Sequence, residues 1–281
     1  MAVIDPPSSW GAEIGGYEIR RELLPGLTAL AIAPGNRAVV LKRLDSDCLV
    51  QSGENPRLHP AIRDRLARVR ELAHGKVANL HGVEHDRGCV YLVWEFVAGQ
   101  TLEDWAMGKN VSPRDLLMTA RELILTIESL HARGIVHGAI HGRNVIVDAA
   151  GKLKLTHVSP LLYTDPRHDL ESVSKLFREL AAQRGEAESP LENLASEAQE
   201  PDGTLRSMET RAASLIDLRR DEASEAVEAE LDLHRRRRSR LGAIAVVLMG
   251  LGLGYGIKQY VQHLTPGPPA PPEASAAAVE P

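Results

Sequence analysis

The residues that could do chemistry gather in two short stretches, residues 135–148 and 151–159. A transfer site of the usual kind needs a side chain that accepts a proton and oxygen ligands for magnesium. Asn144 offers an amide oxygen, but Ala139 cannot accept a proton, and His157 is a poor ligand for a hard, oxygen-seeking ion. These residue types therefore indicate binding rather than metal-assisted transfer.

The spacing of these residues resembles two motifs of the protein kinases. Residues 135–148 resemble the catalytic loop H-R-D-L-x-x-x-N, and residues 151–159 resemble the strand that leads into the D-F-G magnesium motif. When the motifs are aligned on the histidine and asparagine of the loop, four positions of the family pattern hold other residues, namely Gly138, Ala139, His141 and His157. The resemblance implies that Gly138 replaces the loop arginine, Ala139 the catalytic aspartate, His141 the loop lysine and His157 the D-F-G aspartate. No catalytic set is intact, and no metal site is expected.

The stretch Cys89–Trp105 carries a second strong part of the resemblance. It is similar to the kinase hinge pattern Y-L-V-M-E-Y-V-x-G-x-T-L. The resemblance implies that Glu95 and Val97 present backbone groups to an adenine-like ring, and that Trp94 takes the gatekeeper position. A tryptophan there either closes the rear of the pocket or serves as a core aromatic that bridges the lobes.

The phosphate side of this pocket is only partly present in the sequence. Gly26 is the one glycine left of the glycine-rich loop, whose glycines let backbone amides approach phosphate without a Cβ in the way. Val39–Lys42 matches V-A-I-K, so the resemblance implies that Lys42 holds phosphates; the alternative is a lysine that extends from an edge strand to solvent. Arg65 stands where its glutamate partner would be. We therefore expect any nucleotide to bind weakly and almost independently of magnesium.

The sequence also lacks an activation segment. Only 11 residues separate His157 from Asp169, and the stretch from Asp169 to Leu180 resembles the large-lobe helix D-x-x-S-x-G-x-x-L-x-E-L. The resemblance implies that the A-P-E motif and the platform for a protein substrate are absent. It also implies a structural role for Asp169, which would hold the backbone of the catalytic loop.

These motifs predict an α+β fold, the two-lobed protein kinase-like fold with a small β-rich lobe and a larger, truncated α-helical lobe. Residues 1–15 would be a flexible amino terminus, and residues 16–220 the kinase-like domain, divided into a small lobe at about 16–97 and a large lobe at about 98–220. A long amphipathic helix is expected after Ser112, which suits an N-cap, with Pro113 at the first helical position.

The end of the chain predicts a membrane anchor. Residues 241–257 form a run of 17 residues without a charge, which is at the low end for a membrane-spanning helix; a buried core helix is the alternative. Residues 221–240 would form a charged juxtamembrane helix or linker, and residues 258–281 a Pro/Ala-rich tail. The run of arginines at residues 235–240 orients the amino-terminal domain into the cytoplasm and the tail outside. A single-pass protein of the bacterial inner membrane is expected.

Four glycines in this apolar run raise the question of self-association. Gly250 and Gly254 form one G-x-x-x-G pair, and Gly252 and Gly256 form another. Such pairs let helices pack closely in lipid. Because the two pairs lie about 200° apart around a helix, both cannot face one partner. Either one pair makes a homodimer, or the segment is a plain anchor.

Composition argues against several other functions. The net charge of −5 and an aromatic content of 4% disfavour a nucleic-acid partner. The two cysteines, Cys48 and Cys89, show neither metal-ligand spacing nor a disulfide framework.

Two classes of function stay open. One is a membrane-tethered pseudokinase that acts as a signalling scaffold or binding module for an unidentified cytosolic protein, without phosphotransfer. The other is a divergent kinase or other nucleotide transferase that uses Lys42 and Asn144. No cofactor is certain, and ATP without magnesium is the candidate ligand.

Overall fold

The computed structural model describes residues 10–52, 55–185, 189–200 and 202–221. The chain divides into two units, Met1–Arg219 and Arg220–Pro281. The predicted membrane span at 241–257, its four glycines, the tail at 258–281 and nearly all of the linker at 221–240 lie outside the described residues, as do residues 1–9 of the predicted flexible amino terminus. Within the described ranges, no helix is long and apolar enough to cross a membrane.

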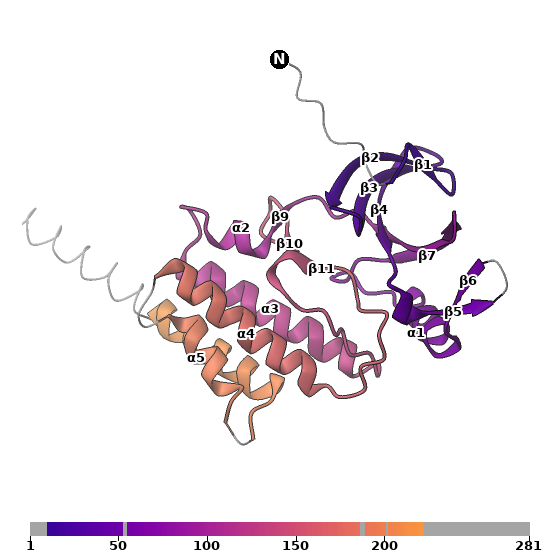
Figure 1. The fold of residues 1–281 in the computed structure, drawn as a ribbon. Coiled ribbons are helices and arrows are strands. Elements are labelled where there is room, and N and C mark those ends of the chain that lie inside the picture. The colour runs from indigo at the N-terminus through magenta and orange to yellow at the C-terminus, as the bar shows by residue number, and fades with distance from the viewer. Residues whose placement is uncertain (1–9, 53–54, 186–188, 201, 222–281) are drawn as a thin grey trace, which may run out of the picture. The chain divides into compact units, whose positions relative to one another are not determined.

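The small lobe is built on one antiparallel sheet with the strand order β1-β2-β3-β4-β8-β7 (Figure 1). Buried side chains alternate along β3, while nearly every residue of β8 is buried, because β8 lies inside the sheet and carries core on both faces. The strand bounds are β1 Glu13–Ile14, β2 Tyr17–Leu24, β3 Thr28–Ala33, β4 Arg37–Arg43, β7 Leu80–Asp86 and β8 Cys89–Glu95.

One helix, α1 (Pro60–Arg70), completes the small lobe. Pro60 suits the first helical turn, where its missing N–H is not needed. The buried face of α1 holds Ile62, Leu66 and Val69, and also the charged Arg65. A 3-10 turn, η1 (Ser46–Cys48), and a separate hairpin, β5 (Leu49–Ser52) and β6 (Asn55–Leu58), precede it. The sequence reading did not anticipate this hairpin.

The large lobe is helical and carries a small sheet of order β11-β10-β9. Ser112 and Asp115 form a capping box at the start of α3, which confirms the predicted helix start with Pro113 at the first position. The remaining bounds are α2 Leu102–Ala106, α3 Pro113–His131, α4 Arg167–Arg184, α5 Pro190–Glu197, β9 Gln100–Thr101, η2 Gly142–Asn144, β10 Val145–Val147 and β11 Leu153–Leu155. A last described helix begins at residue 205.

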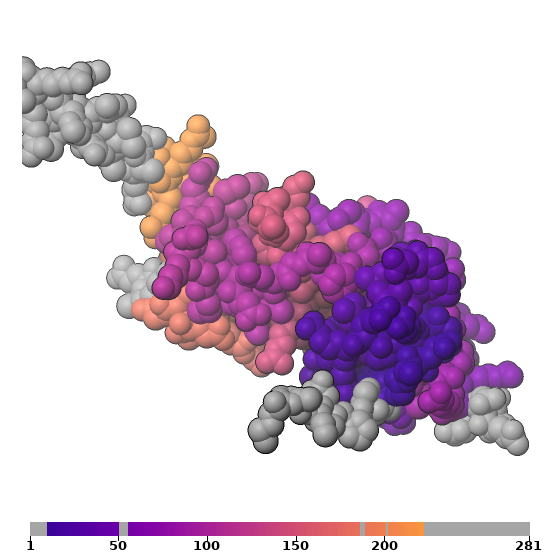
Figure 2. Space-filling model, turned by 90° about the horizontal axis from the view of Figure 1, so that it is seen from above, coloured from indigo at the N-terminus to yellow at the C-terminus, as the bar shows by residue number. Residues whose placement is uncertain are grey.

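The main hydrophobic core joins the two lobes. It includes Trp94 of β8, Leu123 of α3 and Phe177 of α4, all fully buried. A second, smaller cluster packs Trp10 and Tyr91 against the other face of the sheet. Figure 2 shows the first described residues of the folded unit, in indigo, at the opposite end from its last described residues, in orange. The architecture is the two-lobed α+β arrangement that the motifs predicted.

Candidate functional site

Asp169 holds the loop between α3 and β10. Its buried carboxylate accepts hydrogen bonds from the backbone N–H of His137 at 2.7 Å and of Gly138 at 2.8 Å, and contacts His131 Nε2 at 2.8 Å. Burial alone would raise the pKa of Asp169, but these bonds lower it overall. The structural role expected for Asp169 is therefore present.

His137 has a structural role in the same loop. It is fully buried, and its Nδ1 accepts a bond from the N–H of Ala139 at 3.2 Å. Nε2 must then carry the proton, which it donates to the carbonyl of Thr156 at 3.1 Å. Burial lowers the pKa of His137 to about 4. This neutral imidazole fixes the loop against the end of β11.

The two positions that would hold magnesium bind each other instead. Asn144 Nδ2 donates to the carbonyl of Ala139 at 2.8 Å, which turns its Oδ1 toward His157. His157 Nδ1 lies 3.2 Å from that Oδ1 and donates to it. Burial and nearby Lys42 lower the pKa of His157 to about 3, so this ring is neutral. The oxygen that a metal would need is occupied by an N–H.

The donor set therefore does not fit magnesium. Besides that occupied amide, the D-F-G position offers an imidazole nitrogen rather than carboxylate oxygens. Within the described part of the chain, no cluster of three or more His, Cys, Asp or Glu side chains could hold a metal ion. We derive no step that uses magnesium.

Trp94, the residue at the gatekeeper position, lies in the core next to His157. It is fully buried in the main core, and its ring meets that of His157 edge-on, with centroids 5.9 Å apart and planes at 82°. Its Nε1 has no hydrogen-bond partner among the residues that the structure describes. His157 itself has a left-handed backbone, with φ of 60°. Trp94 is therefore a core aromatic that bridges the lobes and packs on His157, and its closure of a ligand pocket stays a prediction.

Lys42 extends from β4 toward this cluster. Its side chain is half-buried, and burial lowers its pKa, while Asp45 acts in the opposite direction. Among the described residues it makes no ion pair or hydrogen bond, so the glutamate contact of active kinases is absent. Lys42 also lowers the pKa of His141, after the larger effect of partial desolvation. The side chain of His141 is exposed.

The turn that carries Gly26 is poorly suited to phosphate. Residues 25–27 form a tight turn, because Leu24 pairs with Thr28 across β2 and β3. Gly26 has φ of 68°, and its N–H donates to the carboxylate of Glu22. A carboxylate at this amide occupies the donor and would repel a phosphate. The sequence did not predict this contact of Glu22.

The hinge keeps free backbone groups. Val97 follows β8, and neither its N–H nor its carbonyl has a partner among the described residues. By contrast, the N–H of Glu95 is used, since it donates to Asn79 at 2.9 Å. Burial alone would raise the pKa of the Glu95 carboxylate, but bonds from Lys154 and Asn79 lower it overall. Of the two hinge residues that the resemblance implies, only Val97 therefore offers a free N–H to an adenine-like ring.

Arg65 replaces an ion pair with bonds to two loops. It is only 4% exposed, although it carries a charge. Its Nε donates to the carbonyl of Ser159 at 2.9 Å, and its Nη2 donates to the carbonyl of Val136. The helix of the small lobe is thereby attached to both functional loops of the large lobe. The position was found by alignment, but this role was not predicted.

The short segment after His157 covers the loop. The Tyr163 ring lies so close to Gly138 that a Cβ there would collide with it, and Gly138 has φ of 70°. Tyr163 also stacks on His168 of α4, with centroids 4.2 Å apart. The surface where a kinase would place its activation segment is thus occupied by a compact turn.

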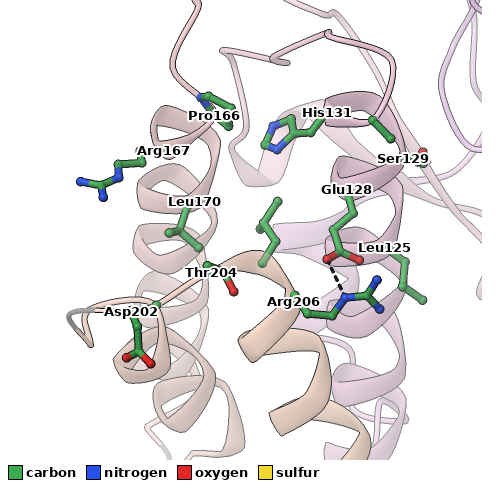
Figure 3. Close-up of a pocket in the computed structure, with 13 residues that line it drawn as sticks. Leu125, Glu128, Ser129, His131, Pro166, Arg167, Leu170, Asp202, Thr204 and Arg206 are labelled. Atoms are coloured by element: carbon green, nitrogen blue, oxygen red, sulfur yellow. Dashed lines mark ion pairs between the residues drawn. The ribbon is translucent and has the colours of Figure 1, made fainter.

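A cavity of about 720 Å³ lies behind this loop, between α3, the start of α4 and residues 202–206 (Figure 3). His131, which contacts Asp169, lines it, and Arg206 pairs with Glu128 across it at 3.7 Å. The cavity contains none of the residues aligned with kinase motifs.

Comparisons with known proteins agree with this geometry. Residues 31–157 match the family described as the protein kinase domain. CBL-interacting protein kinase 17 of Oryza sativa subsp. japonica is 31% identical over 151 residues, which are 52% of this chain and 32% of the relative. CBL-interacting serine/threonine-protein kinase 21 of Arabidopsis thaliana is 26% identical over 148 residues, or 51% of this chain and 35% of the relative. The chain spans about a third of the length of these curated relatives.

Two solved structures share the fold. The kinase domain of PknI from Mycobacterium tuberculosis aligns with a TM-score of 0.54 at 16% identity, over 73% of this chain and 98% of that one. Rad53 in complex with AMP-PNP aligns with a TM-score of 0.53 at 16% identity, over 70% of this chain and 64% of that one. The curated relatives come from plants, so the bacterial source stays a prediction. The described part of this chain is a protein kinase-like domain.

Proposed function

We propose that this chain is a pseudokinase, a binding or scaffold module without phosphotransfer. The observation that carries the proposal is the bond between His157 and Asn144 at 3.2 Å. In a kinase both positions hold magnesium on the phosphates. Here they hold each other, beside the buried Trp94.

Two further losses support the proposal. Ala139 has no group that accepts a proton, and loss of a general base alone costs about 10² to 10⁴ in rate. Tyr163 and the turn around it cover the loop where a protein substrate would approach. The general base, the magnesium ligands and the surface that would receive a protein substrate are therefore all changed or lost.

We propose ATP without magnesium as the ligand of the site formed by Val97, Lys42 and the Gly26 turn. Val97 offers free backbone groups, and Lys42 is a cation without an ion-pair partner in the described residues. The Gly26 turn, with the Glu22 carboxylate on its amide, disfavours the outer phosphates. We therefore expect weak binding.

Phosphotransfer is tested with the full chain, purified in detergent. It is incubated with labelled ATP, magnesium or manganese, and a generic protein acceptor. We expect no more label than in the Lys42→Ala variant. Label that appears reproducibly and disappears in Lys42→Ala would overturn the proposal.

A second candidate function is supported by the state of Lys42. Its lowered pKa and lack of a partner are typical of a reactive amine, which suits a divergent nucleotide transferase. Asn144, the other residue of that hypothesis, is fully engaged with Ala139 and His157. A lysine-directed acyl-phosphate probe would label Lys42 in either case, whereas turnover of nucleotide would favour the transferase.

We further propose that residues 241–257 tether the domain to a membrane, with the domain in the cytoplasm, where it would recruit a protein partner. The support is the uncharged run and the arginines before it. Fractionation of cells that express the full chain tests the tether: the chain should be extracted by detergent and not by alkaline carbonate.

Self-association of this segment is a separate question, because it depends on which glycines face a partner helix. A bacterial two-hybrid assay should lose signal in Gly250→Ile or in Gly252→Ile, but not equally in both. Gly250 and Gly252 represent the two G-x-x-x-G pairs formed with Gly254 and Gly256. An unchanged signal in both variants would leave a plain anchor.

A further inference from the structure

A second cavity, in the small lobe, brings three arginines together. It has a volume of about 560 Å³ and is lined by Arg57 of β6, Arg63 of α1 and Arg87 of the turn between β7 and β8, together with Asp86 and His85. The three arginines come from three separate elements. Their convergence follows from the tertiary fold, and no local run of basic residues in the sequence indicates it.

The three guanidinium groups are available to a ligand. Arg57 has no ion pair or hydrogen bond among the described residues. Arg63 pairs only with its helix neighbour Asp64, at 3.2 Å, and both side chains are 68% exposed. Arg87 lies 3.6 Å from Asp86, too far for a hydrogen bond. Exposed pairs of this kind contribute little and exchange readily.

Arg87 also occupies an unfavourable backbone position. It has φ of 47° and precedes Gly88, which has φ of 73°, in the tight turn between β7 and β8. Two consecutive positive φ angles favour Asn-Gly or Gly-Gly at these places, and a long side chain there is strained. Arg87 lines the cavity and its Nη1 also lies close to Gly11, and a strained residue at a cavity points to a function for its charge.

The charges of the lining indicate the class of ligand. Three guanidiniums stand against the carboxylates of Asp86 and of Asp64, which pairs with Arg63, so the group keeps a net positive charge that suits an anion such as a phosphate monoester. Arginine binds phosphate oxygens with two parallel N–H bonds. Asp86 Oδ2 is buried and has no hydrogen-bond partner among the described residues, and its nearest cation is Arg87.

We propose that this cavity binds a phosphate monoester group, and that Arg57, Arg63 and Arg87 hold its oxygens. The site lies in the small lobe and uses none of the residues aligned with kinase motifs, so it does not depend on the absence of phosphotransfer. Arg63 lies on α1, the helix that also carries Arg65. A ligand in the cavity would therefore contact the same helix that Arg65 attaches to the two loops.

Calorimetric titration of the full chain with inorganic phosphate, and with a phosphoserine peptide and its unphosphorylated form, tests this proposal. We expect Arg57→Gln, Arg63→Gln and Arg87→Asn each to weaken binding about tenfold, as expected for the loss of a charged hydrogen bond. Arg70→Gln is the matched control: it removes one charge from the exposed end of the same helix and should leave binding unchanged.

Arg87→Asn makes the test sharper, because asparagine tolerates positive φ better than arginine. Binding should fall while Tm stays equal or rises. If the phosphoserine peptide binds more tightly than inorganic phosphate, the site is assigned to phosphorylated protein segments. If the two affinities are equal, it is assigned to the free ion. The proposal would be overturned if neither phosphate ligand bound, or if binding persisted in both Arg57→Gln and Arg87→Asn.

Discussion

The hinge and the loop from His137 to Asn144 match the kinase pattern in different ways. At the hinge, β8 is buried and Val97 keeps its backbone groups free for a ligand. In the loop, the backbone is held as the resemblance implies, by Asp169, but the functional side chains bind each other. The shape of a catalytic loop therefore depends on buried bonds to its backbone and does not require the residues that perform catalysis.

The same distinction separates Arg65 from Lys42. Arg65 stands at the position of the kinase glutamate and links the two lobes. Lys42 stands at the position of the kinase lysine and has no ion-pair partner among the described residues. If this comparison is right, structural substitutions should cost far more stability than substitutions at the aligned catalytic positions.

Asp169→Ala should have the largest effect. It would leave the N–H groups of His137 and Gly138 buried without an acceptor, which we expect to cost about 3–5 kcal/mol of unfolding free energy. Urea denaturation measures this loss. Glu171→Ala, an exposed carboxylate on the same helix, should cost under ~0.5 kcal/mol. Equal losses for the two variants would contradict the structural role of Asp169.

Arg65→Met should rank second. The carbonyls of Ser159 and Val136 would lose their donor, at an expected cost of about 2–4 kcal/mol. Hydrogen exchange should also increase in both loops, while Arg68→Met, an exposed arginine of the same helix, should change neither quantity. An Arg65→Met protein as stable as the Arg68→Met protein would show that the link between the lobes is not used.

The pH dependence of stability should be a smaller effect. His137 and His157 have folded pKa values of about 4 and about 3, against the ordinary histidine value of 6.5. Between pH 6.5 and 4 the unfolded chain therefore binds more protons, so stability falls as the pH is lowered, by up to ~1.4 kcal/mol per pH unit for each histidine. The pKa of Asp169 is lowered below 3.8, so its contribution is lost only at still lower pH.

Urea titrations from pH 7 to 5 measure this slope. His157→Asn should make it shallower, because asparagine tolerates a left-handed backbone and does not titrate. His85→Asn, at an exposed histidine, is the control and should keep the wild-type slope. A steeper or unchanged slope in His157→Asn would mean that this ring is not held neutral by burial.

Apart from the β5–β6 hairpin, the sequence predicted the main elements of the two lobes and the positions of the aligned residues, because these depend on periodicity, capping and spacing. Ser112 and Pro113 start α3 as expected, and Asp169 contacts the loop as the resemblance implied. The sequence did not predict what the unusual residues contact. The bonds from Arg65 to Ser159 and Val136 span 94 and 71 residues, and no local pattern encodes such partners.

Two more contacts were missed for related reasons. Glu22 reaches the amide of Gly26 across a turn whose length was not evident, and Tyr163 packs on Gly138 because the deleted segment lets it return to the loop. Two features of the sequence could have indicated these changed contacts. Arg65 stands at a glutamate position of the family pattern, and Gly138 stands at an arginine position. Each showed that a family contact was lost, but not what replaced it.

The central claim is that the bond between His157 and Asn144 has replaced magnesium, and the magnesium dependence of nucleotide binding tests it most directly. Thermal shifts of the full chain with ATP are compared in magnesium and in EDTA, beside the His157→Asp variant, which restores carboxylate oxygens. We predict the same small shift in both conditions for the wild-type chain, and a magnesium-dependent increase only for His157→Asp. Micromolar binding of ATP by the wild-type chain that disappears in EDTA would contradict the account.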